Sequence, residues 1–233
     1  FQAFNKKFYV PNNAVLVVAG QFDKAQAKEW ITNYFGAIPK GAAVTRQKIE
    51  EAPITEAFKA SWEDPNIQIP MVVASYRTPS MKTRDARVLD MISSYLSDGK
   101  SSKLYKKIVD DKKMALQIGA FSYSQEDHGT YILYGLPQGE NTSADLLKEV
   151  DEEIVKLQTE LISENELQKL KNIYDNNYVN SNSSVEGIAD NLATYYMLYK
   201  DVNLINTEIE IYRSITREEI RDIAKKYLNP NKR

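Results

Sequence analysis

One segment of this chain occurs twice, near its two ends. Residues 4–13 read Phe-Asn-Lys-Lys-Phe-Tyr-Val-Pro-Asn-Asn, and residues 223–232 read Ile-Ala-Lys-Lys-Tyr-Leu-Asn-Pro-Asn-Lys, which match without a gap. In both copies a helical pattern ends in Lys-Lys-aromatic, and a proline that cannot continue the helix follows. The repeat predicts a duplicated fold, in which each copy is the tail of one domain.

The first copy is followed by an apolar run, Ala14–Gly20, which predicts a buried strand. A helix is expected next, from an N-cap at Asp23 to Gly36. No such strand follows the second copy, so the sheet of the second domain is expected to have an open edge. We expect residues 14–20 to pair with that edge, in the same chain or in a neighbour.

From residue 54 onward, strand and helix patterns alternate. Strands are expected at 54–61, 67–76, 115–123 and 130–136, and helices at 81–96, 101–109, 143–161, 163–178, 185–199, 203–212 and 216–227. Ser163 and Thr216 each begin a Ser/Thr-x-x-Glu capping box. This order predicts an α+β fold: an antiparallel sheet with helices packed mainly on one face.

The expected organisation has three parts. Residues 1–36 form the strand–helix tail of a preceding domain, 37–53 are a polar linker broken by proline and glycine, and 54–233 form a second domain that lacks its last strand. The chain begins at Phe1 with what reads as the end of a helix. We therefore expect it to be a fragment of a longer protein.

Composition excludes several classes of function. The formal net charge is −2 with Lys and Arg spread along 233 residues, so no nucleic-acid footprint is expected. No apolar run approaches the ~18 residues that a membrane span needs. The chain has no Cys and a single His, His128, which excludes thiolate sites and any metal site that needs two His.

Two stretches together with shorter motifs resemble a known protease family. The stretches are Tyr9–Gly20 and Leu96–Tyr105, the latter reading Leu-Ser-Asp-Gly-Lys-Ser-Ser-Lys-Leu-Tyr. Arg77-Thr78-Pro79 and Ser163–Leu167 lie at matching places. In this order the motifs resemble the second half of a bacterial-type subunit of the pitrilysin and mitochondrial-processing-peptidase family. That family cuts peptides with zinc held by an inverted His-x-x-Glu-His motif.

The resemblance implies a non-catalytic C-terminal domain that forms one wall of a peptide chamber. It implies no cofactor in this chain, with zinc in the preceding domain. The implied partners are that zinc domain of the same chain, a second family subunit and a peptide substrate. The resemblance also places Gly99, Ser101, Ser102 and Tyr105 on the chamber or substrate side.

The family holds its substrate with an Arg and a Tyr seven positions apart. Here the matching positions are Val109 and Leu116, whose side chains donate no hydrogen bond. The resemblance therefore implies that the second subunit carries the Arg/Tyr clamp, and that this chain belongs to a zinc-bearing subunit.

Some residues allow a second interpretation. Gly99–Ser102 could bind a phosphate, but a structural turn is favoured because the Walker spacing is missing. His128 is expected to be exposed in a hairpin turn. The acidic groups Asp110-Asp111 and Asp151–Glu153 are expected on a solvated helix surface. The aromatic run around Tyr195 and Tyr196, with Met197 and Tyr199, is expected to pack as core rather than to dock a partner.

Two other functions stay open at this point. Members of the same family also serve as scaffolding subunits of respiratory complexes, with no protease activity in the parent. An unrelated α+β protein-binding module would fit the same composition. A His-x-x-Glu-His upstream of Phe1 would favour the peptidase, and a different sheet order would favour the unrelated module.

Overall fold

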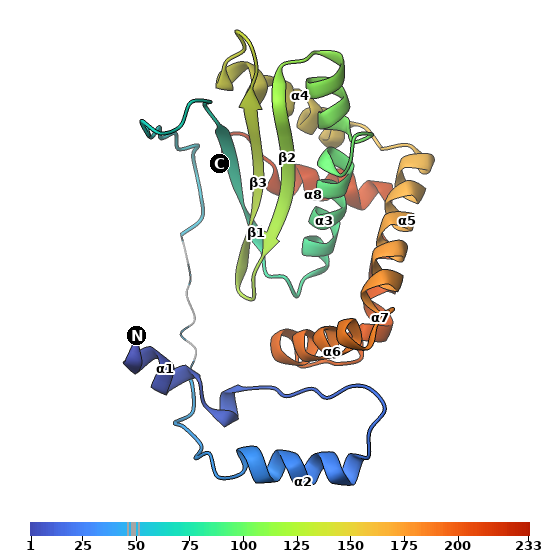
Figure 1. The fold of residues 1–233 in the computed structure, drawn as a ribbon. Helices are drawn as coiled ribbons and strands as arrows, with labels where there is room; N and C mark the ends of the chain where they lie inside the picture. The colour runs from blue at the N-terminus through green and yellow to red at the C-terminus, as the bar shows by residue number, and fades with distance from the viewer. Residues whose placement is uncertain (46, 48–49, 51) are drawn as a thin grey trace. The chain divides into compact units, whose positions relative to one another are not determined.

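The computed structural model describes residues 1–45, 47, 50 and 52–233 (Figure 1). The chain divides into two compact units. One unit comprises 1–50 with 176–208, and the other 51–175 with 209–233. The expected linker 37–53 includes residues 46, 48–49 and 51, which lie outside the described residues.

The second unit is built on a three-stranded antiparallel sheet in the order β1-β3-β2. β1 (Val72–Pro79) and β2 (Ala115–Ser124) both pair with β3 (His128–Pro137), which is the central strand. β2 and β3 form the expected hairpin. Gln125 closes it by donating its backbone N–H to the His128 carbonyl at 3.1 Å.

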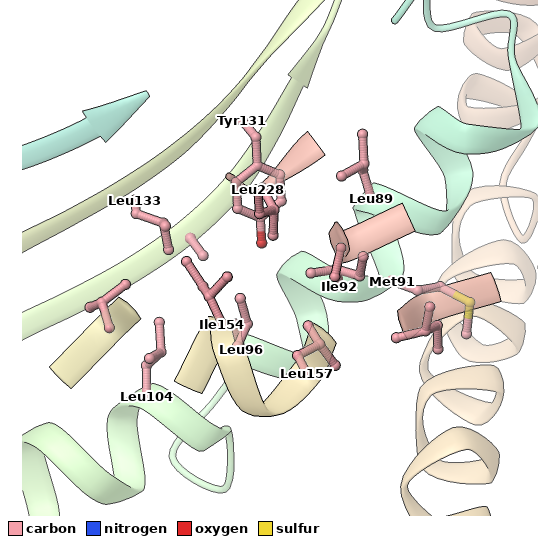
Figure 2. Close-up of a cluster of buried hydrophobic side chains, with 14 of the residues drawn as sticks. Leu89, Met91, Ile92, Leu96, Leu104, Tyr131, Leu133, Ile154, Leu157 and Leu228 are labelled. Carbon is pink, nitrogen blue, oxygen red and sulfur yellow. The ribbon is translucent and has the colours of Figure 1, made fainter. Parts of the chain in front are cut away.

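Three helices form the core of this unit together with the sheet, by contacting its strands or one another. α3 (Arg84–Ser97) contacts β1 and β2, α4 (Ser143–Thr159) contacts β1 and β3, and α8 (Arg217–Tyr227) contacts α3, α4 and β1. Their apolar side chains and those of the strands form one buried cluster (Figure 2). The labelled members are Leu89, Met91, Ile92, Leu96, Leu104, Tyr131, Leu133, Ile154, Leu157 and Leu228.

The other helices of this unit pack at the edge of the core. The π-helix η2 (Tyr105–Asp111) follows α3 and packs on β2. α5 (Glu164–Ser181) and α7 (Leu204–Arg213) each belong to both units, and within the second unit Tyr174 stacks on Tyr212 at a centroid distance of 4.2 Å. The Tyr212 hydroxyl donates to Asp90 Oδ2 at 3.1 Å. This pairing ties α7 to α3.

The first unit contains α1 (Gln2–Phe8), the 3-10 helix η1 (Pro11–Asn13), α2 (Lys24–Phe35), α6 (Val185–Thr194) and the π-helix η3 (Tyr195–Tyr199). Asp23 caps α2 as expected, accepting from the Gln26 backbone N–H at 2.8 Å. None of the described residues from 1 to 45 is buried. The large apolar side chains of this segment are exposed, as in Phe1, Trp30, Tyr34 and Phe35.

The predicted fold class is confirmed: an antiparallel sheet with helices mainly on one face. Both predicted capping boxes are present. The Glu166 backbone donates to Ser163 Oγ and the Ser163 backbone donates back to Glu166 Oε2, at 3.2 and 2.9 Å. Thr216 and Glu219 make the same pair of bonds.

Three predicted strands need correction. Residues 14–20 form no strand within the described chain, so the prediction that they pair with a sheet of the same chain is wrong. Residues 54–61 also form no strand, because no ladder partner lies beside them among the described residues. β1 begins at Val72 rather than at residue 67. Pro70 has no N–H to give to a ladder, which accounts for the late start.

A cluster of ion pairs joins η2 to α4 at the rim of the core. The Lys107 ammonium lies 2.9 Å from Glu149 Oε2 and 3.0 Å from Glu153 Oε1. Lys112 Nζ lies 2.5 Å from Glu149 Oε1. The hydrogen bond from Lys112, supported by Lys107, holds the pKa of Glu149 below its usual 4.5 even though burial opposes this. The Glu149 side chain is only 12% exposed, so these pairs are poorly screened by solvent.

We predict that Glu149→Gln lowers the free energy of unfolding at pH 7 by about 1–3 kcal/mol, the range for hydrogen bonds to charged groups. Because the folded pKa of Glu149 is depressed, its contribution is complete above its ordinary pKa of 4.5 and disappears as pH falls below that value. Urea denaturation from pH 7 to pH 3 should therefore show the variant and the wild type converging in acid.

The matched control is Glu152→Gln. Glu152 also contacts Lys107, at 3.1 Å, but its side chain is 47% exposed. We expect this control to cost less than about 1 kcal/mol at every pH. Equal losses in the two variants, or a Glu149→Gln loss that persists unchanged at pH 3, would contradict the assignment.

Candidate functional site

The face of the sheet opposite the core carries an exposed apolar surface. Strand residues alternate between the two faces, and Ala74, Tyr76, Leu133 and Tyr131 take the buried positions. The outward positions form the set that we call the open face: Val73, Ser75, Arg77, Gly119, Phe121, Tyr123, Thr130, Ile132 and Tyr134. Val73 is 51%, Phe121 42% and Tyr123 57% exposed.

The centre of the open face is organised around Tyr134. Its ring lies against Gly119 on the neighbouring strand, where any Cβ would clash with the ring atom Cε1. Phe121 packs edge-on against it with a centroid distance of 6.3 Å. The Gln117 amide donates to the Tyr134 hydroxyl at 2.9 Å, which fixes the ring's orientation. Because Gly119 has no side chain, the Tyr134 ring can lie flat over the strand.

A polar cavity, which we call the polar hollow, lies at the end of β1 that is next to the turn between β2 and β3. It is a cavity of about 250 Å³ lined by Ile54, Ser75, Arg77, Gln125, His128, Gly129 and Thr130. The Arg77 guanidinium donates to the Ala52 carbonyl. His128 is exposed at the start of β3, as predicted from its place in the turn. The open face is therefore aromatic at its centre and polar at this end.

Gly99, Ser101, Ser102 and Tyr105 lie in the connection from α3 to η2. Gly99 has a φ of +71°, a conformation that favours glycine, and its carbonyl accepts from the Ser102 backbone at 3.1 Å. Ser102 is 2% exposed, whereas Ser101 is exposed and accepts from Lys169 Nζ at 2.6 Å. Tyr105 is half-buried. This arrangement is the turn that the sequence favoured over a phosphate site.

The two positions that match the family's clamp lie in different environments. Val109 belongs to η2 and packs partly buried against the core, while Leu116 is 51% exposed on β2. Neither side chain carries a hydrogen-bond donor. The pair is therefore apolar, with one member packed against the core and the other exposed.

Two expectations about surface and core are wrong in part. Glu153 is not solvated, because its side chain is 11% exposed and is paired with Lys156 at 2.8 Å as well as with Lys107. Part of the aromatic run that was expected to pack in the core is exposed. Tyr196 and Met197 are 49% and 52% exposed, while Tyr195 donates from its hydroxyl to Glu208.

The described residues of this chain do not fit a zinc ion. Among the described residues no three His, Cys, Asp or Glu side chains lie close enough together to hold a metal. The single His, His128, is exposed and lines the polar hollow together with Arg77 and Gln125. Within the described part of the chain, no helix is both long and apolar enough to cross a membrane.

The Gly119, Phe121 and Tyr134 arrangement was not predicted from the sequence. The alternation of apolar residues in both hairpin strands was visible, but it does not say which face the helices leave open. A glycine in the middle of a strand was the available signal, since it often marks a close approach by another group.

The chain is similar to known proteins over most of its length. Residues 1–174 match the model of the peptidase M16 inactive domain. The zinc protease PqqE of Helicobacter pylori is 25% identical over 194 residues, covering 82% of this chain and 44% of that protein. The chain spans about half the length of the curated relatives that it matches, at 44%, 56% and 39%.

Solved structures show the same fold. A protease from Helicobacter pylori superimposes with a TM-score of 0.92 at 21% identity, over 99% of this chain and 56% of that one. A peptidase M16 inactive domain from Pseudomonas fluorescens gives a TM-score of 0.76 at 17% identity, over 99% and 54% of the two chains.

We predict that this chain binds no stoichiometric zinc. The physical reason is the donor set: one exposed His and no Cys. Isothermal titration calorimetry with zinc chloride, with a quenched-peptide cleavage assay alongside, measures both properties. One-to-one binding that His128→Ala removes, or cleavage that a chelator abolishes, would contradict this prediction.

Proposed function

Because the chain belongs to the peptidase M16 family and matches its inactive domain, we propose that its open face forms one wall of the peptide chamber of a zinc metallopeptidase. The observation that carries the proposal is the open face itself. A three-stranded sheet is packed by helices on one side and presents an ordered aromatic surface on the other.

The chemistry of the open face suits extended peptides. Phe121, Tyr123 and Tyr134 offer flat apolar area at little cost in conformational entropy, and Val73 extends that area to β1. Contacts of this kind tolerate many side chains, as a chamber wall must. The polar hollow at Ser75 and Thr130 supplies hydrogen-bonding groups at one end.

The exposed apolar side chains of residues 1–36 support a contact with a preceding domain. Phe1, Trp30, Tyr34 and Phe35 are 103%, 54%, 78% and 53% exposed. Apolar residues gathered on one short segment mark an interaction surface. We propose that this segment packs against a zinc-bearing domain of the same protein, which holds the metal that this chain does not.

A partner subunit completes the proposal. Val109 and Leu116 provide no donors, so the side chains that hold the peptide backbone come from a second subunit of the family. The connection at Gly99, Ser101 and Tyr105 borders the chamber in this arrangement. Ser102 is buried beneath this connection, and its backbone N–H donates to the Gly99 carbonyl within the turn.

We predict that Phe121→Glu weakens the binding of an extended, uncharged, aromatic-rich peptide to this chain by about tenfold, since it places a charge in the middle of the aromatic surface. Fluorescence anisotropy of a labelled peptide gives the dissociation constant. The matched control is Val179→Glu, an exposed valine of α5 outside the open face, which should leave binding within about twofold.

Circular dichroism and thermal unfolding of both variants separate lost binding from lost folding. Equal weakening by the two substitutions, or no binding by the folded wild type, would contradict a peptide-facing role for the open face. In the second case the scaffolding role of some family members becomes the better hypothesis.

A further inference from the structure

The open face changes its chemistry from one cross-strand row to the next. Residues that lie opposite one another in the sheet form three rows on this face: Val73, Tyr134 and Gly119 are the first row, Ser75, Ile132 and Phe121 the second, and Arg77, Thr130 and Tyr123 the third. The first two rows are mainly apolar and aromatic. The third row brings the positive charge of Arg77 to the end of the face that is next to the turn between β2 and β3.

The polar hollow lies at this third row and offers mainly hydrogen-bond donors. Among the described residues that line it, Arg77 contributes a guanidinium, Gln125 an amide, His128 an imidazole, and Ser75 and Thr130 hydroxyl groups. None of these described lining residues carries a carboxylate. A site with a guanidinium and no acidic side chain in its lining is suited to an anionic group that accepts hydrogen bonds.

The acidic residues of the neighbouring turn do not line the hollow. Glu126 lies 3.6 Å from the Lys82 ammonium, so its charge is directed to that lysine. Asp127 is exposed in the turn. Neither residue supplies a carboxylate to the cavity, and the charge that a ligand meets there is that of Arg77.

Arg77 already holds an oxygen acceptor that comes from another segment. Its guanidinium donates to the main-chain carbonyl of Ala52. Ala52 and Ile54 belong to no helix or strand, and Ile54 also lines the hollow. An ionised carboxylate accepts from a guanidinium more strongly than a neutral carbonyl does, and it accepts through two parallel bonds. A carboxylate is therefore able to take the place of the Ala52 carbonyl.

The spacing of the rows matches the spacing of side chains in an extended peptide. Side chains on one side of an extended chain repeat every two residues, at about 7 Å, and the rows of a sheet have the same separation. An apolar peptide side chain on the second row, against Phe121, places the side chain two residues away on the third row. A carboxylate at that position reaches Arg77.

We propose that the polar hollow is a carboxylate subsite of the open face, in which Arg77 binds a carboxylate of an extended peptide in place of the Ala52 carbonyl. The carboxylate belongs to an acidic side chain two residues from an apolar one, or to the C-terminus of the peptide. This proposal rests on the peptide-binding role proposed above for the open face, and it adds the kind of residue that the face selects.

Three labelled peptides test the subsite by fluorescence anisotropy at low ionic strength. One contains Glu-x-Phe-x-Glu and an amidated C-terminus, the second replaces both Glu by Gln, and the third is the Gln peptide with a free C-terminal carboxylate. We expect at least one carboxylate peptide to bind the wild type about tenfold more tightly than the neutral peptide. The stronger of the two identifies the source of the carboxylate, and its advantage should shrink as salt is added.

Two variants assign the preference to the hollow. Arg77→Gln removes the charge and should reduce the advantage of the carboxylate peptide to within about twofold, with little change for the neutral peptide. Ser75→Glu leaves Arg77 in place but adds a carboxylate to the lining at an exposed position, and it should also remove the advantage. The matched control is Arg221→Gln on α8, where the guanidinium lies 2.8 Å from Asp222, and this variant should keep the preference. Circular dichroism confirms that each variant is folded.

The outcomes separate the subsite from the wider role of the open face. Equal affinity of the wild type for all three peptides would overturn the subsite and leave peptide binding by the open face intact. A preference for carboxylate that persists in folded Arg77→Gln, or that Arg221→Gln removes to the same extent, would also overturn it. Failure of all three peptides to bind would contradict the subsite and the peptide-binding role together.

Discussion

The structure depends on the packing of one face of a three-stranded sheet against α3, α4 and α8. Tyr76, Leu133 and Ala120 point into that layer from three different strands, and Leu89, Leu96 and Ile154 meet them from the helices. Each large apolar side chain buried there contributes about 1.5–3 kcal/mol. Because side chains alternate along a strand, burying one set necessarily turns the other set outward. The open face is a direct consequence of the core.

The sequence carried enough information for the class of fold and for most of its elements. The hairpin at residues 115–137, the amphipathic α4 and the capping boxes at Ser163 and Thr216 depend on local patterns, and these were predicted correctly. The strands at 14–20 and 54–61 were not, because a strand exists only where another strand pairs with it. An apolar run reports the tendency to pair and says nothing about the presence of a partner.

Sequence patterns likewise predicted one part of the candidate site and missed the rest. The motif around Gly99 and Ser101 identified the family, and that identification is confirmed. The sequence could not show that Ser102 is buried while Ser101 is exposed, since that depends on how η2 packs on β2. It also could not show that Gly119 leaves room for the ring of Tyr134, because the two residues become neighbours only when β2 pairs with β3.

The polar features of the molecule hold the sheet in place. Lys107 and Glu149 join η2 to α4, and Arg233 joins Asp151 of α4 to Tyr76 of β1. Both clusters lie at the rim of the core, where solvent only partly screens them. They fix the helical layer against the sheet, so that the aromatic surface on the other side is presented on a rigid support. Sites built on helices and strands are more precise than sites on loops, and the open face has such a support.

We propose that this chain presents peptide to a neighbouring catalytic domain through its open face. The most direct measurement is a titration of the ¹⁵N-labelled chain with an extended aromatic-rich peptide, followed by backbone amide chemical shifts. The account predicts saturable shifts concentrated at Val73, Phe121, Tyr123 and Tyr134, with α4 and α5 unaffected. Shifts confined to the helices, or none at saturating peptide, would contradict it.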